Sequence, residues 1–444
     1  MTGVRYNLIS RTLAFAAIAL VAVGATPSLA VVFHRHPVEH HAVEEPAVPL
    51  SSIHVLGDRP APFALDARAA MMIDADTGEV LYAYNEHQKM QPASLAKIMT
   101  FYITLEALKN GKLTPDTGVT ISEKVWRLSI DQTVSKMFLQ VGQQVPVKQL
   151  LYGLMVSSGN DAAMALAEYL GGSEEGFVAM MNEHCQRMGL GDTRFASPDG
   201  LPEPDQYTTA ADMVKLATLL IKRFPDALDI TSIKEFTFDN ITQRNWNTLL
   251  FYDPRVDGLK TGHVDEAGFH LVATAHQDNV RLISALMGAP NAEKRRTETE
   301  KLLAWAFRSF VNVSPDWHNL IPASMPVYEG DASEVPLGPP GSLDITLPKG
   351  EEKKVKLSGG LDVSYLVAPV ALGTRVGSLN VSEDDRTLLS VPIETQKEIR
   401  RGGIFRVLSD KIALMFHRIG HGISAAIRAA IRKIPFIGPR LVGD

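Results

Sequence analysis

Cysteine is almost absent from this sequence, since Cys185 is the single one in 444 residues. One thiol excludes a disulfide within the chain and a zinc site built from several cysteines. The H-E-x-x-H pattern of zinc peptidases does not occur either. Cys185 lies in an amphipathic run over residues 176–188. We therefore expect a buried structural thiol there and no catalytic role for it.

Long apolar runs are also scarce, and the clearest one covers residues 12–25. Arg5 and Arg11 precede this run, and a small-x-small cleavage site follows it at residues 28–30. These features predict a secretory signal over residues 1–30, which is removed from an exported chain. The run is short for a membrane-spanning helix, and an uncleaved anchor is the alternative.

Positive charge is scarce in the body of the chain. The whole chain has 44 basic and 50 acidic residues and a net charge of −6. Residues 401–444 carry eight basic and two acidic residues, and the signal carries two basic ones, so residues 31–400 carry −14. An acidic body argues against a nucleic-acid-binding protein. The basic tail is expected to meet an anionic surface.

The first candidate site is an S-x-x-K pattern formed by Ser94 and Lys97. Residues 94–108 are predicted to form a helix behind Pro92, which places the lysine amine beside the hydroxyl one turn away. A buried lysine loses proton affinity and can take the proton of a serine nucleophile near neutral pH. Alone, the pattern is weak, because an exposed serine and a surface lysine give the same spacing.

The second candidate site is Ser158-Gly159-Asn160, which separates two apolar helical runs over residues 147–156 and 162–170. A serine and an asparagine on either side of a glycine can both point into a cleft. There the hydroxyl can relay a proton and the amide can bind a substrate carbonyl group. The alternative is a polar turn between helices.

The third candidate site is Lys260-Thr261-Gly262, at the end of a strand-like stretch over residues 256–259. The ammonium and the hydroxyl can bind a substrate carboxylate, and the glycine leaves room for a ligand near the backbone. The alternative is an edge strand with a solvated lysine.

In this order the three sites match the S-x-x-K, S-x-N and K-T-G set of penicillin-binding proteins and serine β-lactamases. The flanking residues resemble the low-molecular-mass D-alanyl-D-alanine carboxypeptidases, over about residues 65–416. The resemblance implies an α/β transpeptidase/β-lactamase-like domain, with a sheet from both chain ends and helices inserted between. It also implies a bacterial protein of the periplasm, attached peripherally to the outer face of the cytoplasmic membrane.

The expected secondary structure agrees with that order of elements. The pattern predicts a hairpin over residues 69–85, helices over 94–108, 177–188, 211–222 and 293–310, and strands over 236–238, 248–251, 256–262, 269–275 and 280–287.

The length exceeds that of one domain, and composition divides the chain into five segments. These are a signal (1–30), a linker (31–64), a catalytic domain (65–313), a small all-β sandwich domain (314–400) and a basic amphipathic helix (401–444). The linker holds a cluster of four histidines, for which a metal-binding tract is the alternative to a disordered segment: His34, His36, His40 and His41. We expect the β domain to act as a spacer or docking module.

The tail repeats apolar residues every three or four positions over residues 404–434, with basic residues on its other faces. This pattern is typical of a helix that lies in a membrane interface, and the alternative is a helix docked on its own protein. The family's short C-terminal anchor favours the membrane. The segment runs well past Phe416, with Gly420 and Gly422 interrupting it, and so departs from that pattern.

The resemblance also implies a role for each candidate residue. Ser94 would attack the carbonyl of the penultimate D-alanine in a peptidoglycan stem pentapeptide and form an acyl-enzyme, while Lys97 takes its proton. Ser158 would relay a proton toward the leaving amine, and Asn160 would bind the substrate backbone. β-lactam antibiotics would acylate the same serine. Neither a metal nor another cofactor is expected.

The K-T-G segment would bind the other end of the substrate. Lys260 and Thr261 would hold the terminal carboxylate, and Gly262 and His263 complete the segment. The oxyanion would lie between the backbone N–H groups of Ser94 and His263. One departure stands out in the family's N-x-N-x-L-L pattern, because Trp246 lies where some relatives have an arginine.

Three alternatives remain at this level. A β-lactamase usually has aspartate where Gly159 stands, and class A enzymes need an E-x-x-L-N segment that we do not find. A peptidoglycan D,D-endopeptidase often lacks the C-terminal β domain. A catalytically silent penicillin-binding wall protein is disfavoured because all three motifs are intact.

Overall fold

The structure is a computed structural model that describes residues 52–56, 61–383 and 386–415. Contacts divide the chain into Met1–Ala47 and Val48–Asp444, and all described residues belong to the second unit. The predicted signal, the histidine tract and the tail beyond residue 415 lie outside the described residues.

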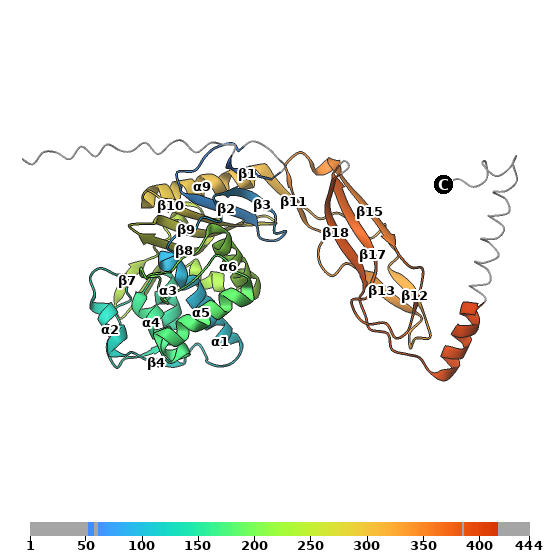
Figure 1. Cartoon of the computed structure of the whole chain (residues 1–444), viewed down its shortest axis with the longest axis horizontal. Coiled ribbons are helices and arrows are strands. Elements are labelled where there is room, and N and C mark those ends of the chain that lie inside the picture. The colour runs from blue at the N-terminus through green and yellow to red at the C-terminus, as the bar shows by residue number, and fades with distance from the viewer. Residues whose placement is uncertain (1–51, 57–60, 384–385, 416–444) are drawn as a thin grey trace, which may run out of the picture. The chain divides into compact units, whose positions relative to one another are not determined.

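A six-stranded antiparallel sheet forms the centre of the first domain, in the order β1-β3-β2-β10-β9-β8 (Figure 1). Its strands are β1 (His54–Val55), β2 (Ala69–Asp74), β3 (Val80–Tyr84), β8 (Val256–Val264), β9 (Gly268–Gln277) and β10 (Val280–Ala289). Both ends of the domain therefore contribute strands, as predicted. β2 and β10 are apolar on both faces because both faces of the sheet are covered.

Helices pack on the two faces of this sheet. One face contacts α9 (Ala292–Ser309), and the other faces a block of inserted helices. The block contains α1 (Lys97–Lys109), α2 (Glu123–Ile130), α3 (Val147–Met155), α4 (Asn160–Gly171), α5 (Glu174–Met188), α6 (Ala210–Arg223) and α7 (Ala227–Thr231). One hydrophobic core fills the space between block and sheet, and a second lies between sheet and α9. Two antiparallel strand pairs accompany the block. β4 (Gly118–Thr120) pairs with β5 (Gln144–Pro146) across the segment that contains α2, and β6 (Glu235–Phe238) forms a hairpin with β7 (Ile241–Arg244).

The predicted strand over residues 248–251 is wrong, because this segment forms the short helix α8 (Leu249–Tyr252). Leu249 and Leu250 are both buried, whereas an extended strand would direct neighbouring side chains to opposite faces. The Asn245 side chain also accepts the N–H of Asn247 at 2.8 Å, and this Asx turn starts a tight turn.

The second domain is all-β, as predicted, and β11 (Phe310–Val313) pairs with β14 (Ile345–Pro348) there. Its larger sheet has the order β15-β17-β18-β13-β12-β16. The strands of that sheet are β12 (Ser324–Tyr328), β13 (Glu334–Gly338), β15 (Val355–Leu361), β16 (Leu366–Val367), β17 (Arg375–Glu383) and β18 (Arg386–Thr395). Helical structure within residues 314–383 and 386–400 is limited to one 3₁₀ turn, Glu352–Lys354.

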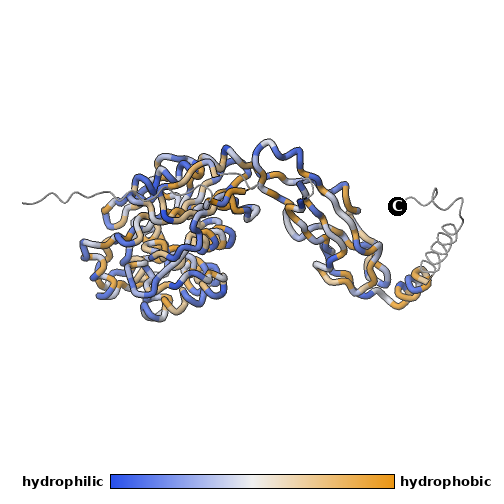
Figure 2. Tube along the Cα trace, turned by 45° about the horizontal axis from the view of Figure 1, so that its top comes forward, coloured by the Kyte–Doolittle hydropathy of each residue, from blue (hydrophilic) through white to orange (hydrophobic). Residues whose placement is uncertain are grey.

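Residues 404–415 are helical, and apolar positions recur between polar ones along this segment (Figure 2). Across the described part of the chain, the helices are all too short or too polar to traverse a bilayer.

Candidate active site

Ser94 lies in a 3₁₀ turn, Ala93–Ala96, and α1 begins with Lys97. The lysine Nζ lies 3.0 Å from Ser94 Oγ, so the predicted pairing of nucleophile and amine is present. The same Nζ donates to Asn160 Oδ1 at 2.6 Å and to the main-chain oxygen of Asp199 at 2.7 Å. These contacts join the first and second predicted sites.

The Lys97 side chain is fully buried, and burial lowers its pKa to about 8. The negative charges of Asp199 and Asp161 oppose this effect and keep the pKa from falling further. A neutral amine has two N–H donors and one lone pair. With both donors directed to Asn160 and Asp199, the lone pair is left for the Ser94 hydroxyl.

Ser158 and Asn160 lie at the turn between α3 and α4, on the wall of the same cavity as Ser94. Ser158 has a left-handed φ of 57°, which is strained for a serine and directs its side chain into the site. A Cβ on Gly159 would lie 2.8 Å from the Asp161 carboxylate, so a larger residue in this turn would displace that carboxylate.

A loop over residues 131–139 forms another wall and was not predicted from the sequence. The buried Asp161 carboxylate accepts the backbone N–H groups of Met137 and Leu139, which fixes this loop to α4. The main-chain oxygen of Ser135 in turn accepts the N–H of Asn160 at 2.9 Å. The loop is mostly polar, and no pattern in its residues distinguishes it from a surface loop.

Lys260 lies on β8, an edge strand, but its side chain is buried and not solvated. Its Nζ donates to Ser158 Oγ at 2.9 Å and to the main-chain oxygen of Thr261 at 3.1 Å. Burial, with the positive charge of Lys97 next, lowers the Lys260 pKa well below its ordinary value. The amine thus lies behind Ser158, while Thr261 and the two following residues line the cavity.

Gly262 lets β8 approach the turn that carries Ser94. A Cβ at this position would lie 3.0 Å from the main-chain oxygen of Pro92 and 3.2 Å from the Cβ of Ala93. Ala93 itself has a left-handed φ of 48°. The glycine therefore leaves room for the backbone before the nucleophile, in addition to any ligand. His263 follows at the cavity wall and stacks on Phe269, with ring centroids 3.8 Å apart.

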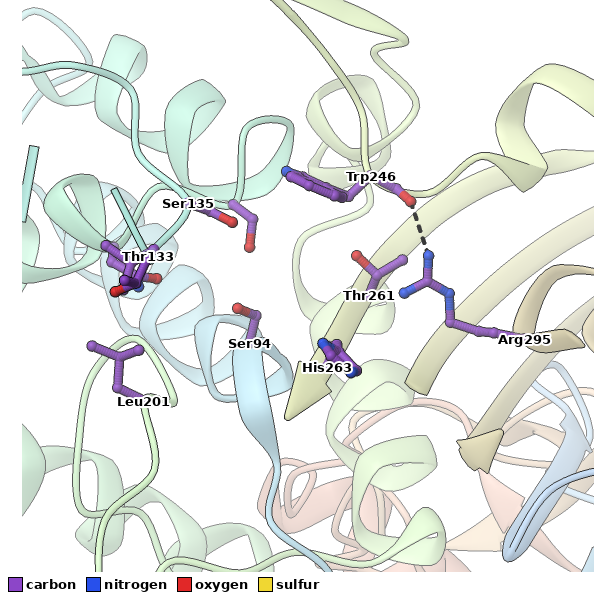
Figure 3. Close-up of a pocket in the computed structure, with 12 residues that line it drawn as sticks. Ser94, Thr133, Ser135, Leu201, Trp246, Thr261, His263 and Arg295 are labelled. Carbon is purple, nitrogen blue, oxygen red and sulfur yellow. Dashed lines mark hydrogen bonds between the residues drawn. The ribbon is translucent and has the colours of Figure 1, made fainter. Parts of the chain in front are cut away.

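The cavity between these segments has a volume of about 220 Å³ (Figure 3). It is lined by Ser94, Thr133, Val134, Ser135, Ser158, Asn160, Leu201, Trp246, Thr261, Gly262, His263 and Arg295. Six of the eight residues predicted for the site line the cavity: Ser94, Ser158, Asn160, Thr261, Gly262 and His263. The other two, Lys97 and Lys260, contact Ser94 and Ser158 through their side-chain amines.

Arg295 is a cavity residue that the sequence prediction missed. It comes from α9, is 6% exposed, and burial lowers its pKa to about 10, so it remains charged at neutral pH. One guanidinium nitrogen donates to the main-chain oxygen of Trp246 at 3.3 Å. No feature of the sequence singles it out, because Lys294 and Arg296 flank it in the first turns of the same helix.

No three His, Cys, Asp or Glu side chains of the described residues lie close enough together to hold a metal ion. Cys185 is buried on α5, and burial raises its pKa to about 12, so the thiol stays protonated at neutral pH.

Two family models match the chain. The model described as D-alanyl-D-alanine carboxypeptidase covers residues 57–291, and the penicillin-binding protein 5 C-terminal domain covers residues 318–401. The chain is 40% identical to D-alanyl-D-alanine carboxypeptidase DacA of Escherichia coli strain K12 over 356 residues. That match spans 80% of this chain and 88% of the relative.

Solved structures give the same result. Penicillin binding protein 5 from Haemophilus influenzae is 38% identical with a TM-score of 0.70, covering 77% of this chain and 99% of that one. Penicillin-binding protein D2 from Listeria monocytogenes, in its cefotaxime-bound form, is 32% identical with a TM-score of 0.51. That match covers 56% of this chain and all of the other. The resemblance read from the three motifs is confirmed, and this protein belongs to the D-alanyl-D-alanine carboxypeptidase family.

Proposed function

We propose that this protein is a serine-type D-Ala-D-Ala carboxypeptidase, which removes the terminal D-alanine from peptidoglycan stem pentapeptides during cell-wall maturation. The observation that carries the proposal is the 3.0 Å contact between Ser94 Oγ and a buried lysine whose pKa is about 8. The nucleophile lines a cavity that also holds a charged guanidinium group, and the base lies directly behind it.

In the first step, neutral Lys97 accepts the Ser94 proton while Oγ bonds to the carbonyl carbon of the penultimate D-alanine. The backbone N–H groups of Ser94 and His263 stabilise the oxyanion. The C–N bond then breaks, and the proton held by Lys97 passes through Ser158 to the leaving amine. Water hydrolyses the ester, with the same lysine as base, and releases the shortened peptide.

Asn160 and Lys260 support this sequence from two sides. The Asn160 amide oxygen already accepts from Lys97, which leaves its amide nitrogen for a substrate carbonyl group. Lys260 donates to Ser158 Oγ, and so the hydroxyl hydrogen of that serine is free to point into the cavity.

The terminal carboxylate is proposed to bind Thr261 and Arg295. Both line the cavity, and among the described residues no carboxylate forms an ion pair with this arginine. A bidentate guanidinium contact fixes a carboxylate in one orientation and so positions the scissile bond. Lys260, placed behind Ser158, contributes through its hydrogen bond to that serine.

β-lactam antibiotics are proposed as acylating inhibitors, since they present a carbonyl group and a carboxylate to the same residues. The relative from Listeria monocytogenes has been solved with cefotaxime bound.

The segments derived from the sequence remain part of the proposal: signal 1–30, linker 31–64, catalytic domain 65–313, β domain 314–400 and tail 401–444. Two of these limits are corrected, because β1 (His54–Val55) belongs to the central sheet and β11 (Phe310–Val313) pairs with β14 of the β domain. The described part of the tail exposes five large apolar side chains: Ile404, Phe405, Leu408, Ile412 and Met415. Arg401, Arg406 and Lys411 accompany them. Such a helix suits the outer, anionic surface of the cytoplasmic membrane, and the exported enzyme would act in the periplasm.

The test is D-alanine release from a synthetic peptide ending in D-Ala-D-Ala. Wild-type protein is expected to release it, and Ser94→Ala is expected to release none while keeping its melting temperature. Release by the variant at the wild-type rate would refute the assignment of the nucleophile. Cleavage of cross-linked peptides without release from the linear one would identify an endopeptidase.

A further inference from the structure

Trp246 supplies the largest apolar side chain of a mostly polar cavity. The other lining groups are chiefly hydroxyl, amide, imidazole and guanidinium groups, with Val134 and Leu201 as the remaining apolar ones. The indole is 53% exposed. Ligand pockets are lined largely by apolar and aromatic side chains, so the free surface of this residue is available for ligand contact.

The local fold does not require an indole at this position. The flanking Asn245 and Asn247 side chains are buried and anchor the segment, donating to the main-chain oxygens of Ile233 at 2.8 Å and Gly258 at 3.0 Å. The side chain between them therefore projects the other way, into the cavity. The residue at position 246 is thus free to set the properties of the cavity wall.

Two hydrogen bonds hold this residue in place. The indole Nε1 donates to the main-chain oxygen of Ser157 at 3.2 Å, and its own main-chain oxygen accepts from Arg295 at 3.3 Å. Figure 3 shows the ring extending from the Arg295 side toward Ser135, next to Thr261. Because the one polar group of the ring is already bonded, its free surface offers only apolar contact.

We propose that the face of Trp246 forms the wall of the subsite for the side chain of the substrate's terminal residue. The inference rests on the proposed function, in which Thr261 and Arg295 bind the terminal carboxylate. A side chain branches from the carbon next to that carboxylate. Trp246 adjoins this place, since its main-chain oxygen accepts from Arg295 and its ring lines the cavity with Thr261. The ligand class is a peptide ending in a D-residue with a small apolar side chain, and Trp246 selects the methyl group over hydrogen.

The test compares kcat/KM for two synthetic peptides, ending in D-Ala-D-Ala and in D-Ala-Gly. One methyl group in an apolar subsite is worth roughly tenfold or more in kcat/KM, so the wild type is expected to prefer D-alanine by at least that factor. Trp246→Ala is expected to lose most of the preference, mainly through slower cleavage of the D-alanine peptide. Trp246→Phe keeps a ring and is expected to retain part of it.

Tyr252→Ala is the matched control. This side chain is 64% exposed at the end of α8, six residues further along, and it does not line the cavity. It is expected to leave both rates and their ratio unchanged. Melting curves of all variants verify the fold. If Trp246→Ala does not fold, the test rests on Trp246→Phe, for which a smaller preference for the D-alanine peptide than in the wild type is expected.

Equal slowing of both peptides by Trp246→Ala would overturn the inference, since the ring would then act by positioning Arg295 or the Ser157 turn. An unchanged preference would overturn it as well. Failure of the proposed function is a different result, because the wild type would then release no terminal residue from either peptide.

Discussion

The two sides of the cavity each hold one fully buried lysine, and the surroundings of the two differ. On the side of the nucleophile, Lys97 faces two carboxylates, Asp199 and Asp161, which offset part of the desolvation. Its pKa is lowered to about 8, where a lysine can exchange protons at physiological pH.

On the opposite side, Lys260 has no such compensation among the charges that shift its pKa. Burial lowers that pKa, and the positive charges of Lys97 and Arg295 lower it further. Its amine contacts Ser158, whereas that of Lys97 contacts Ser94. Burial alone therefore does not decide what a lysine does in this site. The hydroxyl that each amine contacts, Ser94 for Lys97 and Ser158 for Lys260, separates the base from the hydrogen-bond donor.

The largest expected effect is at Lys97. Arginine keeps the charge and the donors but does not lose its proton, so Lys97→Arg is expected to slow acylation by a penicillin about 10³-fold, like Lys97→Ala. The measurement is the second-order acylation rate by mass spectrometry, with melting curves to verify the fold. Substantial acylation of Lys97→Arg would show that this lysine is not the base.

A smaller loss is expected at Lys260, where a donor is sufficient. Lys260→Ala is expected to reduce acylation roughly 10²-fold, since Ser158 loses the hydrogen bond that orients it, and Lys260→Arg is expected to restore part of the rate. The same acylation assay measures both variants. Equal losses for alanine and arginine would contradict the distinction drawn between the two lysines.

The spacing between the two sides depends on Gly262. Gly262→Ala places a methyl group against the backbone of Pro92 and the side chain of Ala93. Overpacking of this kind costs about 1–3 kcal/mol, and we expect a lower melting temperature together with roughly tenfold slower acylation. Gly341→Ala is the control, because a Cβ there meets no atom within 4 Å. Wild-type values for Gly262→Ala would show that the two segments are not in close contact.

The smallest expected effect is a shift along the pH axis. Acylation is expected to rise with pH around the Lys97 pKa of about 8, because the neutral amine is the base. Asp199→Asn removes a negative charge that raises this pKa, so the inflection moves to lower pH. The main-chain oxygen that accepts from Lys97 is retained.

The control for this shift is Asp116→Asn, an exposed residue that does not line the cavity. It is expected to leave the pH profile in place. A profile of Asp199→Asn that coincides with the wild type would mean that Asp199 does not act on the base.

The sequence predicted the three motifs, the order of helices and strands and the all-β domain, because each depends on local spacing. The i, i+3 spacing of Ser94 and Lys97 is set by one helical turn, and the run over β10 is mostly apolar, with Arg281 and Ser284 as its polar members. The short helix α8 was missed, because its turn depends on a side chain two residues away and on burial of neighbouring leucines.

The remaining features of the site depend on tertiary contacts. The loop over residues 131–139 is held by Asp161, and Arg295 reaches the cavity from a helix more than 200 residues after Ser94. The place of Lys260 behind Ser158 follows from how β8 packs against the turn before α4. None of these contacts leaves a periodic signal in the sequence.

The most direct test of the account is mass spectrometry of the mature protein after incubation with a penicillin, followed by peptide mapping. We predict one stable adduct on Ser94, as expected for a slowly deacylating enzyme whose nucleophile is activated by Lys97. Unmodified protein with intact antibiotic would contradict the account and indicate a silent wall protein. Unmodified protein with hydrolysed antibiotic would contradict it in favour of a β-lactamase.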